Sequence, residues 1–467
     1  MKKILSIALA SAILAAGCRK IEVDGGTTTV VVTNPTGPTG QTITLEGKIS
    51  KDTVLKAINT YILKGLVYMN NNATMTVEAG TTIKGDIITV GGLVITRGAK
   101  LVAQGAVDKP IVFTSSSASP RSGDWAGIVL LGKAPTNSSF NGTAGLGEIE
   151  GGINDAAGNG LYGGTDAADN SGVLSYVRIE YAGYAFLPDK EINSLTMGGV
   201  GNGTQIDHVQ VTFAKDDAYE WFGGTVNCKY LIAYKTQDDD FDTDNGFSGK
   251  IQFGLIIRDS SIADISKSEA FESDNDANGS TLGPITSAVF SNITAIGPKA
   301  TLNNNGSSLF LAGAQIRRNS RESIFNSVFL GWPIGILIDG SKGTPTDLNI
   351  NDSTLRIRNC IIAGCGTAVK YAASGTAPTG ATDATVQAWF TNPYFGNSIL
   401  AINDDAKFVN PFNYGLPDFG PFGTSPAVTG ASFTDAKLAG FSTVAFKGAI
   451  APAGADAVWH KGWTKFN

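Results

Sequence analysis

The segment QIDHVQVTF (residues 205–213) and the segment NCKYLIAYK (227–235) share one strand pattern and start 22 residues apart. In both, an aliphatic residue at the fifth place, Val209 or Leu231, precedes a second small or aliphatic residue two places on. Alternation with period two and β-branched residues predicts a short strand. The pattern recurs in seven segments, whose anchor residues at the fifth place are Val177, Val209, Leu231, Leu255, Ile293, Val328 and Ile361.

The spacing of these anchors indicates a repeat architecture. The intervals run from 22 to 38 residues. The shorter ones match one coil of a parallel β-helix, and the longer ones fit a coil with an inserted loop. A β-sandwich would also contain many short strands, but it would not repeat one strand pattern in one register. The 58 glycines among 467 residues suit the tight corners of a β-helix. We therefore predict an all-β fold, a parallel β-helix with inserted loops, over residues 41–390.

The C-terminal part of the chain breaks this pattern. Residues 391–467 are rich in Phe, Pro and Gly, as in NPFNYGLPDFGPFG (410–423). The open end of a β-helix must be covered, because a free strand edge pairs with other chains. We therefore expect residues 391–467 to form a C-terminal cap packed on the helix.

The first residues predict export. Lys2 and Lys3 precede an apolar run that is too short to span a membrane as a permanent helix, which is typical of a secretory signal peptide over residues 1–17. The ending LAAGC resembles the bacterial lipoprotein box, in which the cysteine, here Cys18, is acylated. The alternative is an ordinary signal peptide that happens to contain a cysteine.

A lipid-anchored location follows from this interpretation. Residues 18–40 would comprise the acylated cysteine and a flexible tether rich in Thr, Gly and Pro. No later stretch is long and apolar enough to cross a membrane. We expect an outer-membrane lipoprotein that faces the cell exterior, with the membrane as a partner through its lipid anchor.

Eight runs of sequence carry a more specific pattern. They are TVEAGTTIKGD (76–86), LVITRGAKLVAQG (93–105), KPIVFTS (109–115), GDWAGIVLLGKAPTN (123–137), DNSGVLSYVRIEYAG (169–183), FGGTVNCKYLIAYKTQDDDFDTDNGFSGKIQFG (222–254), FESDNDANGS (271–280) and IRRNSRESIFNSVFLGWP (316–333). Together they resemble a poorly characterised family of Bacteroidota secreted proteins and lipoproteins. The resemblance covers roughly residues 60–340. It implies a right-handed parallel β-helix outside the cytoplasm and implies no particular reaction.

Three acidic stretches align without a gap: DDAYEWFGG (216–224), DDDFDTDNG (238–246) and SEAFESDND (268–276). The first two are 22 residues apart, so we expect them on adjacent coils at about 4.8 Å. An aromatic column at their fourth place should point into the core and fix the register of its acidic neighbours. The acidic columns read Asp217, Asp239 and Glu269; then Glu220, Asp242 and Glu272; then Phe222, Asp244 and Asp274.

Such a ladder of carboxylates predicts a metal site. Each pair at ~5 Å costs on the order of 1–3 kcal/mol at an effective dielectric of about 20–80, unless the carboxyls are protonated, paired or metal-bound. Calcium accepts carboxylate ligands and is the cofactor that we expect. The alternative is a solvated acidic face in which lysines neutralise some of the charge. The predicted ligands are Asp217, Glu220, Asp239, Asp240, Asp242, Asp244, Glu272 and Asp274.

The sequence leaves catalysis open and favours a role without it. The motif QDD (237–239) resembles the paired aspartates of pectin-type glycoside hydrolases, but the Gly-His-Gly that follows in those enzymes is absent. Neither His208 nor His460 lies in a nucleophile context, so a serine-type triad is not supported. A calcium-dependent lyase would need a cationic base near the metal. The candidate bases are Lys235, Arg258, Arg317 and Arg318.

The favoured function is a calcium-stabilised binding or scaffolding module with carbohydrate as its ligand class. The alternatives are a calcium-dependent polysaccharide lyase or hydrolase, and an accessory lipoprotein subunit of an outer-membrane transport complex. The net charge of −6 argues against nucleic acid as a partner. Candidate platforms for sugar rings are Tyr184, Phe186, Tyr219, Trp221, Phe222 and Trp332.

Two cysteines flank a predicted turn. Cys360 and Cys365 are compatible with a disulfide in an oxidising compartment and equally with two small buried thiols.

Overall fold

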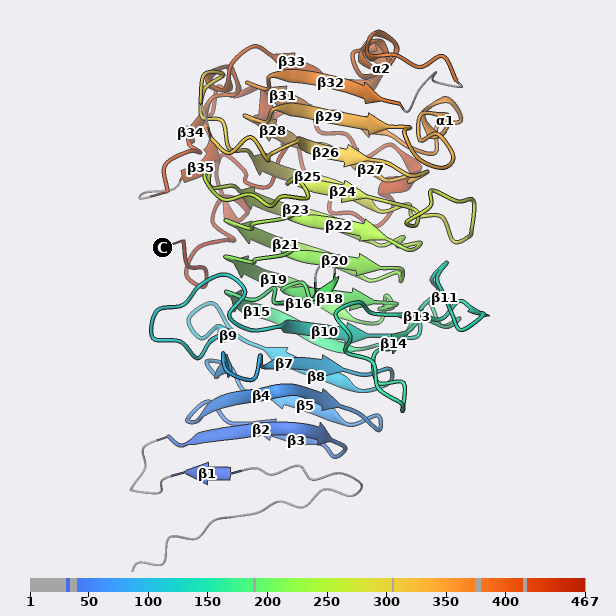
Figure 1. Ribbon diagram of the computed structural model, residues 1–467. Helices are drawn as coiled ribbons and strands as arrows, with labels where there is room; N and C mark the ends of the chain where they lie inside the picture. Colours follow the sequence, from blue (N-terminus) through green and yellow to red (C-terminus); the bar gives the residue numbers. More distant parts are fainter. Residues whose placement is uncertain are drawn as a thin grey trace, which may run out of the picture.

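Parallel strands stacked from one end of the molecule to the other form the three faces of a β-helix (Figure 1). This confirms the predicted fold class. The computed structural model describes residues 31–33, 40–187, 190–304, 306–373, 379–414 and 418–466. The predicted signal peptide and Cys18 lie outside the described residues. No helix among the described residues is long and apolar enough to cross a membrane.

The first and second faces share several long strands that bend from one face to the other. The shared strands are β15 (Gly172–Glu180), β19 (Gln205–Thr212), β21 (Asn227–Tyr234), β23 (Lys250–Ile257) and β25 (Val289–Ile296). The first face also contains β3 (Thr53–Leu55), β5 (Thr74–Val77), β8 (Lys100–Gln104), β27 (Ser323–Phe325) and β30 (Ile357–Arg358). The second face also contains β2 (Thr42–Ile49), β4 (Thr60–Met69), β6 (Thr82–Gly85), β9 (Ile111–Ser115), β28 (Val328–Leu330), β31 (Ile361–Ala363) and β33 (Ser398–Leu400).

The third face follows the second in each coil. The ends of β2 and β4 begin it, and its other strands pair in parallel in chain order. They are β7 (Gly92–Ile95), β10 (Gly127–Leu131), β18 (Leu195–Gly198), β20 (Tyr219–Phe222), β22 (Phe241–Asp244), β24 (Phe271–Ser273), β26 (Ala312–Ile316), β29 (Ile334–Asp339) and β32 (Thr367–Ala372).

A residue in the left-handed backbone region marks the bend between the first and second faces in successive coils. Glycine or asparagine usually fills such a position, because a Cβ atom makes it costly. Here aromatic rings stack along the column, with centroids 4.4 Å apart from Tyr176 to His208 and again from His208 to Tyr230. The positions, all with φ between 50° and 64°, are Tyr176, His208, Tyr230, Phe253, Asn292, Asn326 and Asn359.

The predicted aromatic column lies in the core. Tyr219, Phe241 and Phe271 are fully buried and stand opposite one another on adjacent strands. Their ring centroids are 5.5 Å apart at both steps, with edges turned to faces. Such aromatic contacts add about 0.5–1.5 kcal/mol each beyond the burial of apolar area.

The predicted register of the anchor residues is wrong in part. The first three anchors pair as expected, but Gly254 stands opposite Leu231, and Leu255 stands opposite Ile232. The last two anchors are displaced in the same way, because Val328 pairs with Thr294. A shift of one residue turns a side chain from the inside of a sheet to the outside. Leu255 and Val328 therefore point outward, away from the core.

A C-terminal strap, residues 403–466, covers these outward residues. It winds over the second face and the adjoining part of the first face, where Asp435 pairs with Arg356 and Arg358. Its last residues lie on earlier coils than its first residues (Figure 1). Gln210 exchanges two hydrogen bonds with the backbone of Lys465, at 2.7 and 2.8 Å. The short elements of the strap are η2 (Asn403–Ala406), β34 (Phe408–Asn410), β35 (Asp418–Pro421), η3 (Pro426–Val428), η4 (Ala436–Leu438) and η5 (Ala455–Ala457).

The end of the coils is covered by an element that precedes the strap. Helix α2 (Asp383–Phe390) packs on β32 and places Val386 and Phe390 in the interior apolar cluster. Residues after 403 also pack on the helix, but most of them lie along a side of the coils and do not cover this end. Two further short helices near this end are α1 (Leu348–Asn351) and η1 (Pro393–Phe395).

An insertion between β10 and β15 covers part of the third face. Its side chains Ile149, Ile153 and Tyr162 pack on outward residues of that face such as Leu131. Within the predicted tether, β1 (Val31–Thr33) pairs antiparallel with β2. The insertion contains β11 (Ser139–Phe140), β12 (Thr143–Ala144), β13 (Gly147–Glu148) and β14 (Leu161–Tyr162), and a later hairpin contains β16 (Ala185–Leu187) and β17 (Lys190–Glu191).

Candidate metal centre on the third face

Three adjacent strands of the third face place the acidic columns on the outside of the helix. Glu220 on β20 stands opposite Asp242 on β22, which stands opposite Glu272 on β24. This confirms the predicted alignment. Because side chains alternate along a strand, the inward aromatic column turns these three carboxylates outward.

A second acidic column lies where the chain enters these strands. The backbone N–H of Asp239 donates to Asp217 Oδ1 at 2.8 Å, and the N–H of Glu269 donates to Asp239 Oδ1 at 2.5 Å. Each carboxylate thus accepts a hydrogen bond from the next coil. Asn193 lies at the start of the column, where its side chain accepts from the Asp217 N–H and donates to Glu220. These bonds hold the column in place.

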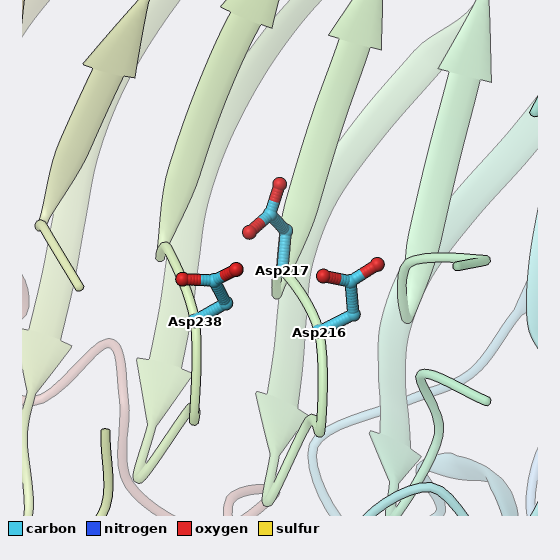
Figure 2. Close-up of side chains that lie close together, drawn as sticks. All are labelled: Asp216, Asp217 and Asp238. Atoms are coloured by element: carbon cyan, nitrogen blue, oxygen red, sulfur yellow. The ribbon is translucent and has the colours of Figure 1, made fainter. Parts of the chain in front are cut away.

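The two columns bring carboxylates together in three sets, and in each set one oxygen of every residue lies within 4.8 Å of the others. Figure 2 shows the first set, in which Asp216 and Asp217 precede one strand and Asp238 precedes the next. Asp217 belongs to the first two sets, so these two are contiguous. The sets are Asp216, Asp217 and Asp238; then Asp217, Glu220 and Asp242; then Asp239, Glu269 and Glu272.

Burial opposes ionisation of these carboxyls. Loss of solvent, followed by the neighbouring carboxylates, raises the pKa of Asp217, Glu220 and Asp242 well above the ordinary values of aspartate and glutamate. Burial and Asp239 also raise the pKa of Asp238 to about 8. The centre would therefore hold protons at neutral pH unless a cation replaces them.

Protein cations reach only one side of the centre. Arg317 forms ion pairs with Glu272 and Asp274, and Arg318 Nη1 lies 2.5 Å from Asp274 Oδ2. Within the described part of the chain, no lysine or arginine nitrogen lies within 4.0 Å of a carboxylate oxygen of Asp217, Glu220, Asp239 or Asp242. Among the described residues, Asp217, Glu220, Asp239 and Asp242 thus have no lysine or arginine as a direct counterion.

Three of the predicted ligands, Asp240, Asp244 and Asp274, stand apart from the three sets. Asp240 is fully buried, and its Oδ2 lies 3.1 Å from Nη1 of the equally buried Arg258. Asp244 accepts a hydrogen bond from the Asn245 N–H at 2.5 Å, and burial raises the pKa of its carboxyl to about 7. The structure therefore does not bring Asp240 together with the other predicted ligands.

The structure adds four residues that the sequence analysis did not assign to the metal. Asp216, Asp238 and Glu269 complete the sets, and Asn193 supplies an amide. The alignment contained a signal for the first three, since they stand in its first two columns. The third member of the first column is Ser268, whose hydroxyl donates to the Gln237 carbonyl. The position of Asn193 depends on the stacking of coils, which no short stretch of sequence shows.

The donor atoms fit a hard divalent cation. All are oxygens of carboxylates or of one amide, which are the ligands that calcium takes. In addition, Asp242 Oδ1 is buried and has no hydrogen-bond partner among the described residues. Such an orphaned oxygen costs free energy unless a partner satisfies it.

Most of the predicted sugar platforms are core residues. Tyr219, Trp221 and Trp332 are fully buried, so these three pack in the core and offer no ring face to a sugar. The side chain of Phe222 is 9 % exposed, and its ring centroid lies 6.1 Å from that of Tyr162. Tyr184 and Phe186 are half-buried, with ring centroids 5.1 Å apart, and remain candidates.

The other candidate catalytic groups are engaged in structure. Lys235 pairs with Asp259 at 3.3 Å, and Arg258 is buried against Asp240. His208 stands in the aromatic stack, and burial lowers the pKa of His460 to about 4. Arg317 is the candidate base that borders the acidic sets.

Both cysteines of the predicted turn are free thiols. Cys360 Sγ lies 3.4 Å from the Arg358 carbonyl oxygen, and Cys365 Sγ accepts from the Trp332 N–H at 3.4 Å. The structure thus contains the second of the two alternatives, two small thiols without a disulfide.

Comparison with known proteins gives one match. A family model described as a pectate-lyase like beta helix domain matches residues 47–397, which span the coils and the acidic columns. No curated protein and no solved structure matches the chain.

Proposed function

Because the chain belongs to the pectate-lyase-like β-helix family, we propose that it is a calcium-stabilised module that binds carbohydrate. Family membership fits a carbohydrate-related role in broad terms. The observation that carries the calcium part of the proposal is the set Asp217, Glu220 and Asp242. One carboxylate oxygen of each residue lies within 4.8 Å of the others, and none of the three forms an ion pair with a lysine or arginine among the described residues.

The residues that would hold calcium are Asp217, Glu220 and Asp242, with Asp216 and Asp238 on one side and Asp239 and Glu269 on the other. A bound cation would stabilise the ionised carboxylates and connect neighbouring coils. The stacked β-helix would supply a rigid scaffold for ligands on its outer faces.

We further propose that Cys18 carries a lipid and that the protein is displayed on the outer membrane. The support is the sequence of residues 1–18, with its basic start, short apolar run and LAAGC ending. Radiolabelled palmitate incorporation in the bacterial host, with Cys18→Ser as the comparison, tests the anchor. Label that persists in the variant would contradict it.

Calcium titration of the full chain by calorimetry tests the metal centre. We expect binding in the wild-type protein and none after Asp217→Asn together with Asp242→Asn. Calcium at about 100 times its Kd should raise the free energy of unfolding by about 2.7 kcal/mol. The control pair Asp108→Asn and Asp404→Asn removes the same charge at exposed positions and should leave binding intact. Absence of wild-type binding at millimolar calcium would exclude the proposed centre.

One observation favours lyase activity as the second candidate function. Arg317 borders the acidic sets, and burial, followed by the charge of Arg318, lowers the pKa of its guanidinium. An arginine with a lowered pKa beside a metal is suited to remove a proton. Incubation with acidic polysaccharides and detection of unsaturated products tests this candidate. Products that form equally with Arg317→Lys would assign the activity elsewhere.

A further inference from the structure

A groove of about 680 Å³ lies on the first face, beside the C-terminal strap. The starts of β19, β21 and β23 form its floor, and the strap residues Ala439, Gly440 and Phe441 form one wall. The groove is separate from the acidic centre, which lies on the third face. Its volume lies in the range of about 300–1,000 Å³ that is usual for ligand sites.

Two columns of polar side chains line the floor. Asp207 stands opposite Lys229, which stands opposite Gln252. Gln205 stands opposite Asn227, and Asn227 Oδ1 accepts from the N–H of Lys250 on the next coil at 3.0 Å. Parallel strands repeat at about 4.8 Å, so successive coils offer polar groups at a regular spacing. Amide, carboxylate and amine groups on a rigid floor suit a ligand with many hydroxyl groups.

The lysines give the floor a positive charge. Lys229 Nζ donates to Ser442 Oγ at 2.9 Å, and Lys250 Nζ donates to the Ala439 carbonyl. Both acceptors are neutral, and neither lysine is in an ion pair with a carboxylate among the described residues. Within the described part of the chain, these two charges therefore have no carboxylate in an ion pair with them, although the net charge of the chain is −6.

The one carboxylate on the floor is already satisfied. Asp207 accepts hydrogen bonds from Ser175 Oγ and Gln205 Nε2, both at 2.7 Å, and its Oδ1 lies 2.7 Å from His208 Nδ1. The side-chain hydrogen bonds that it receives keep the pKa of Asp207 below its usual value, although burial alone would raise that pKa. Asp207 therefore keeps its negative charge, and the two lysines leave the groove with an excess of positive charge.

We propose that this groove binds an oligosaccharide chain that carries acidic groups. The lysines would bind the acidic groups, Asn227 and Gln205 would bind hydroxyls, and the half-buried ring of Phe441 would form an apolar wall. The proposal rests on the proposed carbohydrate-binding function and gives it a location and a ligand class. In the absence of calcium the acidic centre has no cation to attract the same ligand, so the two sites can be separated by experiment.

Calorimetry with the full chain in EDTA tests the groove. The probes are hexagalacturonate, a heparin hexasaccharide and cellohexaose, which are carboxylated, sulfated and neutral chains of equal length. We expect at least one acidic hexamer to bind and cellohexaose to bind at least tenfold more weakly, which corresponds to about 1.4 kcal/mol. The binding should weaken as salt rises, because salt screens the lysine charges. Equal binding of the neutral hexamer would overturn the proposal.

Two variants locate the binding site. Lys229→Gln with Lys250→Gln should weaken binding of the acidic hexamer at least tenfold. Asn227→Asp keeps the acceptor for the Lys250 N–H, adds a negative charge to the floor, and should also weaken binding with an unchanged Tm. The control, Lys51→Gln with Lys109→Gln, removes the same charge at exposed positions and should leave affinity unchanged.

The outcomes separate the groove from the proposed function. If binding required calcium and the affinity were unchanged in the groove variants, the groove proposal would be overturned and the proposed carbohydrate binding would stand. Absence of binding to any hexamer, with calcium or with EDTA, would overturn both. Equal loss in the groove variants and the control pair would show nonspecific attraction and would also overturn the groove.

Discussion

The second and third faces of the helix differ in what covers their outward side chains. On the second face, Ile232, Leu255 and Ile257 point outward and are buried by the strap. On the third face, Glu220 and Asp242 point outward from the same coils, and burial raises the pKa of both. Apolar side chains are covered by protein, whereas the carboxylates are suited to a cation.

This difference shows where the coils acquire their function. The inward residues of both faces contribute to one continuous apolar cluster, so the core does not distinguish them. The outward residues decide whether a face binds the chain itself or something else. A shared fold therefore carries separate surfaces, and function has to be argued from each surface.

The largest expected effect comes from the second face, which the strap covers. Trp463→Ala should lower the free energy of unfolding by about 3–5 kcal/mol, because it leaves a cavity where a large ring was fully buried. Trp463 also contacts the rings of Tyr176 and His208, with centroids 5.8 and 5.9 Å away. Urea unfolding measures the change. Tyr394→Ala, at a ring that is 86 % exposed, is the control and should cost little. An equal loss of stability in both variants would contradict a stabilising role for the burial of Trp463 under the strap.

The acidic face should respond to pH when calcium is removed. Its carboxyls have a higher pKa in the folded chain than in the unfolded chain, as for Asp238 at about 8 and Asp244 at about 7. The folded state then binds more protons, so its stability is fully present below the unfolded pKa and falls as pH rises through the folded values. In EDTA we expect the free energy of unfolding to fall by about 3 kcal/mol from about pH 5 to about pH 8.

Variants assign this pH dependence to the acidic face. Glu220→Gln with Asp242→Asn should flatten the slope. Glu322→Gln is the matched control, because burial raises the pKa of this interior carboxyl to about 8 and it too contributes to the slope. If Glu322→Gln alone removed the slope, the dependence would belong to the interior and not to the third face.

A smaller effect tests how the strap is attached. Asn326 has a φ of 51°, accepts from the Ser432 N–H at 2.9 Å and donates to the Ser432 carbonyl at 3.1 Å. Asn326→Ala should lower the free energy of unfolding by about 2 kcal/mol, through lost hydrogen bonds and left-handed strain. Asn326→Gly removes the bonds without the strain and should cost less in the same thermal unfolding measurement. Equal stability of wild type and Asn326→Ala would show that this attachment is unimportant.

The sequence predicted the parts of the fold that repeat locally. The acidic stretches contain aromatic residues at one fixed place, so Phe241 and its neighbours set the register of Asp242 correctly. The strand anchors were less reliable. Leu255 resembles an interior residue because the outward side of the second face is apolar as well, and alternation then carries no information about which side faces inward.

Long-range contacts account for what the sequence did not predict. The strap contacts Gln210 through Lys465, which lies 255 positions later, and no local pattern predicts such a pair. Asp240 resembled its acidic neighbours, yet it faces Arg258 from the following coil. The groove could not be predicted either, because its floor and its wall come from segments far apart in the sequence.

The reversed path of the strap has a consequence for the timing of biosynthesis. The ribosome makes every coil before it makes residues 403–466, so the coils can stack while the outward side chains around Leu255 still face water. A nascent chain at that stage exposes a long apolar stripe and is prone to aggregate. Residues of the strap therefore bury this apolar stripe only after the coils have been made.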